Sequence, residues 1–390
     1  MHIVFADHPV PKSITKSIFL AGPSPREMGV VDWRHEAIEY LQSIEFDGTL
    51  FIPVPEQRFY GNSDSTTWTY NDQVEWECQC RHVSDVILFW VPRDIKGKMP
   101  AFVTNIEFGE DLNSGKIVYG RPVTAEKCRY LDKRMIDKGL PVWETLESTF
   151  NHAISVLGEG SLRHDGEVFV PLFIWKSPQF QSWYANLKMA GNRLVSAELK
   201  SHVMIRNEFL LAYTMAVNVW VEAEQRHKDN EIIFSRTDIS TVLAYYEDGD
   251  DTKIVLVKEF RSPVSNSEGF VYELPGGSAV KAGVDPLENA QDELKDETGI
   301  LIEDLKRFEW VGQRQLAATL STHQAHLYRV KLNEFEYNQL LGSISSKRNF
   351  GLDDDGEKTY VNLVSLKDLG NSLLDYSMLG MIYSALASRP

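Results

Sequence analysis

The chain has 390 residues, a formal net charge of −16 and a sequence pI of about 5.1. Hydrophobic residues make up 43% of it and charged residues 25%, which is typical of globular proteins and sufficient for two or three domains. The acidic balance argues against duplex nucleic acid as a partner, because such a partner needs a basic surface. Small anionic ligands are not excluded, since a bound divalent cation can supply local positive charge.

The cysteines and the N-terminal residues indicate the compartment. The 3 cysteines, Cys78, Cys80 and Cys128, form no CxxC pair, so the sequence predicts neither a disulfide framework nor a structural zinc site. The N-terminal segment is interrupted by Asp7 and His8 and does not resemble a signal peptide. Because no run of about 18 apolar residues occurs, we expect no membrane span and a cytoplasmic protein.

Residues 1–125 alternate between strand-like and helix-like patterns. Short, almost wholly apolar strands between amphipathic helices predict a buried parallel sheet, and therefore a doubly wound α/β domain. The predicted strands are 17–22, 49–56, 85–92 and 116–120, and the predicted helices are 32–44, 71–83 and 104–113. A helix over 142–157 would close this domain.

A polar, glycine-rich stretch over 158–167 predicts a linker, and the predicted domains are residues 1–160 and 161–390. Beyond the linker the pattern becomes rich in β-branched strands with turn signals, followed by one strong helix over 285–298, further strands and a C-terminal helix over 372–387. This order indicates an α+β domain with a mixed sheet.

The helix over 285–298 concentrates carboxylates. Asp285 is suited to cap its start, Pro286 to its first turn, and Gly299 to its end. Between them Glu293, Asp296 and Glu297 fall within an arc of about 100°. A solvated acidic face would explain this pattern. A divalent cation would also explain it, because Mg²⁺ takes carboxylate ligands and would remove the repulsion between them. The glycines of the preceding "ELPGG" could bring backbone close to the same cation.

This segment resembles the Nudix hydrolase box, G-x5-E-x7-R-E-U-x-E-E-x-G-U, in which U is a bulky apolar residue, and the preceding "VLVKEFRSP" resembles the ADP-ribose pyrophosphatase branch. The resemblance implies an α/β/α sandwich and a Mg²⁺ or Mn²⁺ site. Glu293 and Glu297 would be the main ligands, with Asp296 and the backbone of Gly277 beside them. The reaction would be cleavage of the diphosphate of a nucleoside diphosphate linked to another group.

The chain departs from the box at three positions: Val284 occupies the upstream glutamate slot, Asp292 the arginine slot and Ser278 the glycine slot. Loss of the glutamate and arginine together is milder than loss of one, because no unpaired charge is left. The departures nevertheless leave room for a non-catalytic, nucleotide-sensing or interaction protein.

The same resemblance suggests further site residues. Glu357, in the acidic stretch "GLDDDGEKTY", would be the catalytic base unless this stretch is only an exposed loop. Arg261 would meet a phosphate or ribose, or else be a surface arginine. Glu273 would support the metal ligands, or else end a strand in solvent. Proteins of this type are commonly dimers, so we expect a homodimer.

Residues from about 15 to 125 resemble the nucleoside 2-deoxyribosyltransferase-like proteins. The features that match are a glycine turn after the first strand (Gly22), an aspartate that begins a later strand (Asp85) and the glutamate of "NIEFG" (Glu107). The resemblance implies a flavodoxin-like fold. It also implies Glu107 as the nucleophile at C1′, with Asp85 facing the base or sugar at the carboxyl side of the sheet.

Other residues of this region are candidates for lining the nucleotide pocket: Asp32, Arg34, Glu75 and Trp76, with Arg34 a candidate for a 5′-phosphate. Structural explanations exist for some of them. Thr104 and Glu107 have the spacing of a capping box, and Trp76 could be a core residue. The sequence therefore predicts a nucleotide-binding domain that either binds or cleaves an N-glycosidic nucleoside or nucleotide.

Overall fold

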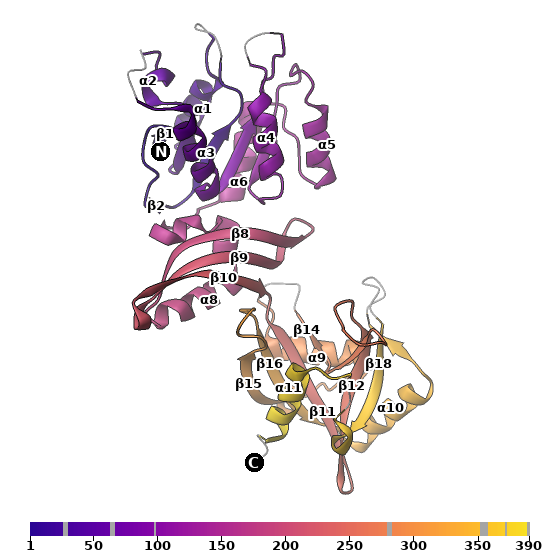
Figure 1. Cartoon of the computed structure of the whole chain (residues 1–390). Coiled ribbons are helices and arrows are strands. Elements are labelled where there is room, and N and C mark those ends of the chain that lie inside the picture. The colour runs from indigo at the N-terminus through magenta and orange to yellow at the C-terminus, as the bar shows by residue number, and fades with distance from the viewer. Residues whose placement is uncertain are drawn as a thin grey trace. The chain divides into compact units, whose positions relative to one another are not determined.

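The computed structural model describes residues 1–25, 30–62, 67–96, 99–278, 283–351, 358–370 and 373–387. The chain divides into two compact units, residues 1–234 and 235–390, and Figure 1 labels the elements of both. This division falls later in the chain than the expected boundary after residue 160. The described residues include no helix that is long and apolar enough to cross a membrane.

A parallel sheet is the centre of the N-terminal unit. Its five strands have the order β1–β4–β3–β5–β6, and every neighbouring pair is parallel. They are β1 (His2–Phe5), β3 (Ser17–Ala21), β4 (Thr49–Ile52), β5 (Val86–Trp90) and β6 (Ile117–Gly120). The chain runs from β3 to β4 on one side and returns to β5 on the other. The order of the strands therefore reverses at β3, as in doubly wound folds. The predicted parallel sheet is confirmed, and it is consistent with a flavodoxin-like fold.

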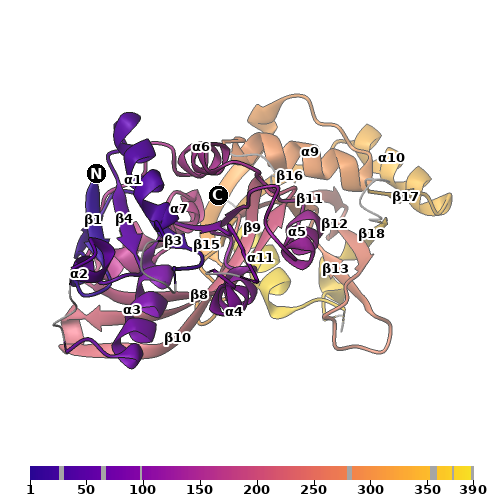
Figure 2. The same ribbon diagram turned by 90° about the horizontal axis from the view of Figure 1, so that it is seen from above.

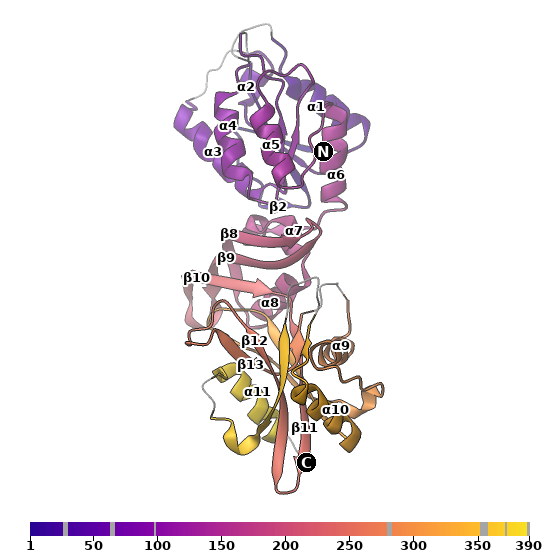
Figure 3. The same cartoon turned by 90° about the vertical axis from the view of Figure 1, so that its right-hand side faces the viewer.

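Successive side chains of the buried strands point to opposite faces of the sheet, so the strands contribute to two hydrophobic cores. In β3, Ile18 and Leu20 face one core and Phe19 and Ala21 face the other. Helices α1 (Trp33–Ser43) and α6 (Leu146–Leu157) cover the first face. Helices α3 (Tyr70–Val83), α4 (Phe102–Asp111) and α5 (Arg129–Asp137) cover the second. Figure 3 shows α1 and α6 on one side of the sheet and α3 and α4 on the other. A strand buried on both faces needs apolar residues at every position, which explains the nearly continuous apolar runs.

The rest of the N-terminal unit is a three-stranded antiparallel sheet of order β10–β9–β8, packed on short helices (Figure 1). Its strands are β8 (Arg193–Ile205), β9 (Phe209–Val221) and β10 (Arg226–Arg236). Apolar residues of β8 and β9 pack on α7 (Leu172–Trp175) and α8 (Pro178–Met189) in a core of their own.

The expected linker over 158–167 lies inside the N-terminal unit. β7 (Arg163–His164) pairs with β2 (Ser13–Ile14), and a 3-10 turn follows at Asp165–Phe169. The Arg163 side chain is fully buried and forms an ion pair with Asp85 at 2.7 Å. The polar, glycine-rich pattern predicted a linker here, but the stretch is attached to the parallel sheet through the buried Arg163–Asp85 pair.

The C-terminal unit has a mixed sheet. Its order is β15–β16–β11–β12–β18–β17, with only the β11–β16 pair of this path parallel. The strands are β11 (Ile239–Asp248), β12 (Asp251–Phe260), β15 (Glu309–Gln315), β16 (Gln324–Lys331), β17 (Asn349–Phe350) and β18 (Thr359–Ser365), and two short strands, β13 (Phe270–Glu273) and β14 (Gly276–Gly277), pair with β12 and β11. Helices α9 (Pro286–Thr298) and α10 (Glu334–Ser345) contribute to the core on one face, and α11 (Tyr376–Ala387) to the core on the other. Figure 2 shows α9 and α10 together on one side of the sheet. The predicted mixed sheet is therefore present, as are the predicted helices over 285–298 and 372–387, which correspond to α9 and α11.

The ends of α9 follow the sequence signals. Asp285 accepts hydrogen bonds from the backbone of Leu287 and Glu288, and Pro286 occupies the first turn. Gly299 ends the helix with φ of 75°, a left-handed conformation that glycine adopts without steric cost.

Candidate active site

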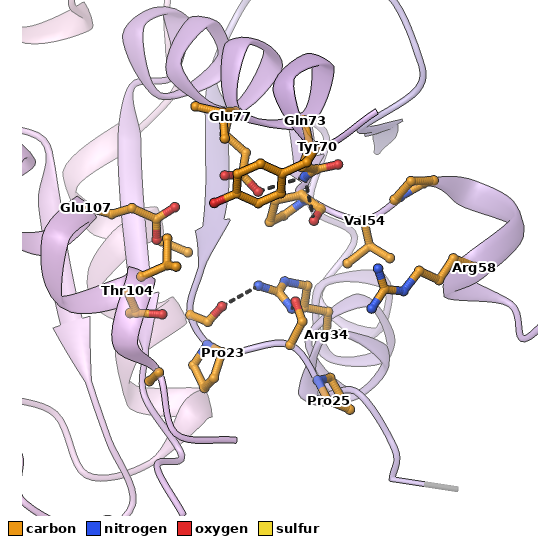
Figure 4. A pocket seen from close by; sticks show the side chains of 18 of the residues that line it. Pro23, Pro25, Arg34, Val54, Arg58, Tyr70, Gln73, Glu77, Thr104 and Glu107 are labelled. Carbon is orange, nitrogen blue, oxygen red and sulfur yellow. Dashed lines mark hydrogen bonds between the residues drawn. The ribbon is translucent and has the colours of Figure 1, made fainter. Parts of the chain in front are cut away.

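A cavity of about 470 Å³ opens at the carboxyl ends of β3 and β4, where the strand order reverses. The segment after β3 contributes Gly22, the segment after β4 contributes Val54, and the α3 and α4 helices contribute further parts of the wall (Figure 4). Open α/β sheets bind ligands at this position, because the loops separate there and leave a crevice.

Gly22 lets two loops approach each other at the cavity. Its φ is +147°, and a Cβ atom at this position would lie 2.2 Å from the carbonyl oxygen of Trp90. The Gly22 carbonyl accepts a hydrogen bond of 2.8 Å from Nη2 of Arg34. The structure therefore places Gly22 in the cavity wall.

The Arg34 side chain lines the cavity but is largely engaged by the protein. It is fully buried, and its Nε donates to the carbonyl of Leu20 at 3.1 Å. Its Nη1 lies 3.1 Å from both carboxylate oxygens of Asp32 and 3.2 Å from the hydroxyl of Ser24. Together with the bond to Gly22, these contacts fix the turn after β3.

Asp32 is positioned as a support for this turn. It caps the start of α1 by accepting from the backbone of Arg34, and it is not among the residues that line the cavity. The buried Asp32–Arg34 pair thus holds the cavity wall from behind.

Two glutamates meet in the cavity wall, Glu107 from α4 and Glu77 from α3 (Figure 4). Burial, and next the charge of Glu77, raise the pKa of Glu107 to about 7. Burial also raises the pKa of Glu77, although a hydrogen bond of 2.7 Å from Gln73 favours its charged form. Because like charges this close disfavour double ionisation, the pair retains a proton near neutral pH.

Glu77 was not predicted from the sequence, whereas its neighbours Glu75 and Trp76 were predicted to line the pocket. α3 starts with a capping box between Thr69 and Asp72, and this start fixes which residues face the cavity. Gln73 and Glu77, one helical turn apart, line the cavity, whereas Glu75 is exposed. The i, i+4 spacing of these two polar residues was the signal that could have identified this face.

Trp76 is a core residue and not part of the cavity wall. It is 6% exposed, its ring packs near Phe19 and Phe51, and its indole N–H donates to the carbonyl of His8 at 2.8 Å. On α3, Trp76 therefore faces the sheet while Glu77 faces the cavity.

Asp85 lies away from the expected position. It precedes β5 and therefore sits at the amino end of the strand, whereas the cavity is at the carboxyl end. Its carboxylate accepts from the hydroxyl of Ser17 at 3.0 Å and pairs with Arg163. An aspartate that precedes a strand cannot reach the carboxyl end of that strand. The contacts of Asp85 here are therefore structural.

The capping-box explanation for Glu107 does not hold. α4 begins at Phe102, with Ala101 in the cap position and no side-chain cap. Thr104 and Glu107 both lie inside the helix and both line the cavity. Glu107 is therefore available to a ligand.

In the C-terminal unit, α9 directs two of its three predicted carboxylates toward the glycine pair of β14. Glu297 is 3% exposed and accepts a hydrogen bond of 3.0 Å from the backbone of Gly276. The Glu293 carboxylate lies so close to Gly277 that a Cβ atom there would be 2.5 Å from Oε1. The Asp296 side chain, in contrast, is 41% exposed.

Asp296 thus faces solvent, unlike Glu293 and Glu297. Within the described residues, no group of three or more His, Cys, Asp or Glu side chains has an arrangement that could hold a metal ion. Asp292, at the arginine slot, is exposed, and Val284 is 37% exposed. The departures from the box therefore leave no buried unpaired charge at these slots.

Arg261 and Glu273 form one cluster near the end of β12. Nη2 of Arg261 lies 2.7 Å from Glu273 and 2.8 Å from the buried Glu259. Arg261 and Glu273 also line a second cavity of about 460 Å³. Glu357 lies outside the described residues.

The comparison with known protein families agrees with the fold of the N-terminal sheet. Residues 15–122 match the family model described as nucleoside 2-deoxyribosyltransferase like. The match spans the whole cavity wall from Gly22 to Glu107 and stops before α9. No curated protein matches the chain.

Proposed function

We propose that the N-terminal unit cleaves or transfers the N-glycosidic bond of a nucleoside or nucleotide, with Glu107 as the group that acts on C1′. The observation that carries this proposal is the Glu77–Glu107 pair at the strand-reversal cavity, with the pKa of Glu107 raised to about 7. The family match over residues 15–122 supports the same class of reaction.

The reaction needs one ionised carboxylate and one proton that can be donated, and the Glu77–Glu107 pair can supply both. When the bond between C1′ and the base nitrogen breaks, the electron pair leaves with the base, and positive charge develops on the sugar. An ionised carboxylate of Glu107 stabilises that charge or bonds to C1′. The proton that the pair retains near neutral pH can pass to the departing base, directly or through water. Water or a second base then attacks C1′ and returns a proton to the pair.

The supporting residues have separate tasks in this proposal. Gln73 orients Glu77 by its hydrogen bond, and Arg34 holds the turn of Gly22 at the cavity edge. Asp85 and Trp76, given substrate roles from the sequence, contribute to stability here. Glu77 takes the place that the sequence analysis assigned to Asp85.

The test is chromatographic detection of free base after incubation with a panel of nucleosides and deoxynucleoside 5′-monophosphates. We expect release of base by the wild type and a loss of at least about a hundredfold in Glu107→Gln, as for removal of a nucleophile or general acid. Glu39→Gln, an exposed change on α1, is the matched control. Base release that is equal in Glu107→Gln and wild type would refute the assignment. Ligand binding without any base release would favour a sensing role.

For the C-terminal unit we propose, as a second candidate, metal-dependent hydrolysis of a nucleoside diphosphate linked to another group, with Mg²⁺ or Mn²⁺. The buried Glu297 beside Gly276 and the Glu293 carboxylate beside Gly277 favour it. Calorimetric titration with Mn²⁺ tests it: Glu297→Gln should weaken binding, while the exposed Glu303→Gln should not. Unchanged Mn²⁺ binding in Glu297→Gln would contradict this candidate. The expected homodimer stays a prediction for sedimentation analysis.

A further inference from the structure

The walls of the N-terminal cavity carry opposite charges. The carboxyl pair of α3 and α4 forms one wall, and the guanidinium of Arg58 extends into the cavity from the other side (Figure 4). Within the described lining, Arg34 and Arg58 are the cationic side chains. The contacts of Arg34 to Asp32, Leu20 and Gly22 occupy most of its N–H groups, which leaves Arg58 as the main cation for a ligand.

Arg58 belongs to a short helix that is firmly anchored. α2 (Glu56–Phe59) follows β4, and its Phe59 ring stacks on His35 with ring centroids 4.0 Å apart. The backbone N–H of Glu56 donates to Asp7 at 3.0 Å. These contacts hold the base of the Arg58 side chain on a fixed element, so that less entropy is lost when a ligand orders it.

The Arg58 guanidinium has no acidic partner within ion-pair distance among the described residues. The acid next to it on α2, Glu56, lies 3.1 Å from Nε2 of His8 instead. On a chain of net charge −16, Arg58 is an exposed cation at the cavity that no described carboxylate neutralises. It offsets the repulsion that the protein exerts on anionic ligands.

We propose that Arg58 binds the 5′-phosphate of the ligand, and that the cavity therefore selects nucleoside 5′-monophosphates over uncharged nucleosides. The inference rests on the proposed function, which puts C1′ at Glu107. The 5′ substituent lies at the other end of the sugar and so extends toward the opposite wall. A guanidinium matches a phosphate with paired N–H donors, and the cavity volume is in the range of small-ligand sites.

Equilibrium binding measured by calorimetry tests the proposal without requiring turnover. The probes are deoxyadenosine 5′-monophosphate and deoxyadenosine. We expect the wild type to prefer the monophosphate by about tenfold or more, as for hydrogen bonds to a charged group. Arg58→Gln should lose this preference without weakening deoxyadenosine binding. Arg58→Lys should keep part of this preference, because lysine retains the positive charge but lacks the planar, paired N–H donors of arginine.

Arg129→Gln, an exposed arginine on α5 that does not line the cavity, is the matched control and should behave as the wild type. Equal affinities for the two probes in the wild type, or an unchanged preference in Arg58→Gln, would overturn the proposal, as would absence of monophosphate binding. Failure of the proposed function is distinguishable. In that case no base is released from either compound, yet the binding preference and its loss in Arg58→Gln persist.

Discussion

Replacement of Glu107 by glutamine should change how the stability of the N-terminal unit depends on pH. The ordinary pKa of this carboxyl is 4.5, and in the folded protein it is raised to about 7. Below about pH 4.5 both the folded and unfolded states hold the proton. Between these two values only the folded state holds it, so the free energy of unfolding falls as the pH rises. The loss is complete above about pH 7.

The size of this effect follows from the shift. A change of about 2.5 pKa units corresponds to about 3 kcal/mol at 1.36 kcal/mol per unit, which is an upper value because the carboxyl is only partly buried. Glutamine has no such titration. The stability of Glu107→Gln relative to the wild type should therefore increase by up to about 3 kcal/mol between about pH 5 and pH 8.

Urea unfolding followed by tryptophan fluorescence can measure this difference. Of the nine tryptophans, only Trp310 lies in the C-terminal unit, so the signal reports mainly on the N-terminal unit. Glu39→Gln on α1 is the control, and its stability should parallel the wild type over the same pH range. Parallel curves for Glu107→Gln and wild type would refute the reasoning, because they would mean that Glu107 is ionised alike in the folded and unfolded chain.

Three further substitutions test residues of the N-terminal unit that support the cavity or the sheet. Gly22→Ala should abolish ligand binding measured by calorimetry, because its Cβ would lie 2.2 Å from the Trp90 carbonyl oxygen; retained affinity would contradict this. Arg163→Met should lower stability to urea by about 3–5 kcal/mol, since it leaves Asp85 buried without its cation, and a loss below about 1 kcal/mol would show that the pair contributes little. Trp76→Phe should lower stability by about 1–3 kcal/mol through the carbonyl it leaves unpaired, with ligand affinity unchanged; weaker binding would return Trp76 to the site.

The parallel sheet and the ends of α9 could be predicted because each depends on local chemistry. Apolar runs such as 17–21 and 86–90 specify strands buried on both faces. Asp285 and Gly299 specify the ends of α9 through their own side chain or backbone freedom. Gly22 and Glu107 were assigned from the resemblance, and the structure brings both to one cavity.

The roles of the remaining site residues depend on the direction in which each side chain points. The order of residues along the chain does not specify this direction. Glu75, Trp76 and Glu77 are adjacent, yet one is exposed, one lies in the core and one lines the cavity. A shift of one residue on a helix turns the side chain by about 100°, so the register set by Thr69 decides the role of each. Arg58 gave no signal, because its position depends on how the chain after β4 returns to the cavity.

The two ends of the parallel sheet both bury charge, and what differs is whether that charge has a dedicated partner. At the amino end Asp85 is paired with Arg163 at 2.7 Å, so this charge contributes to the stability of the fold. At the carboxyl end the cations nearest to Glu107 are already engaged, Arg34 by Asp32 and Arg81 by Glu110 and Asp111. Glu107 is thus left beside another carboxylate, with its pKa raised into the range where proton transfer is efficient. A carboxyl pair without a free cation beside it is suited to proton transfer, and such a pair lies at the carboxyl end of the sheet, next to Gly22.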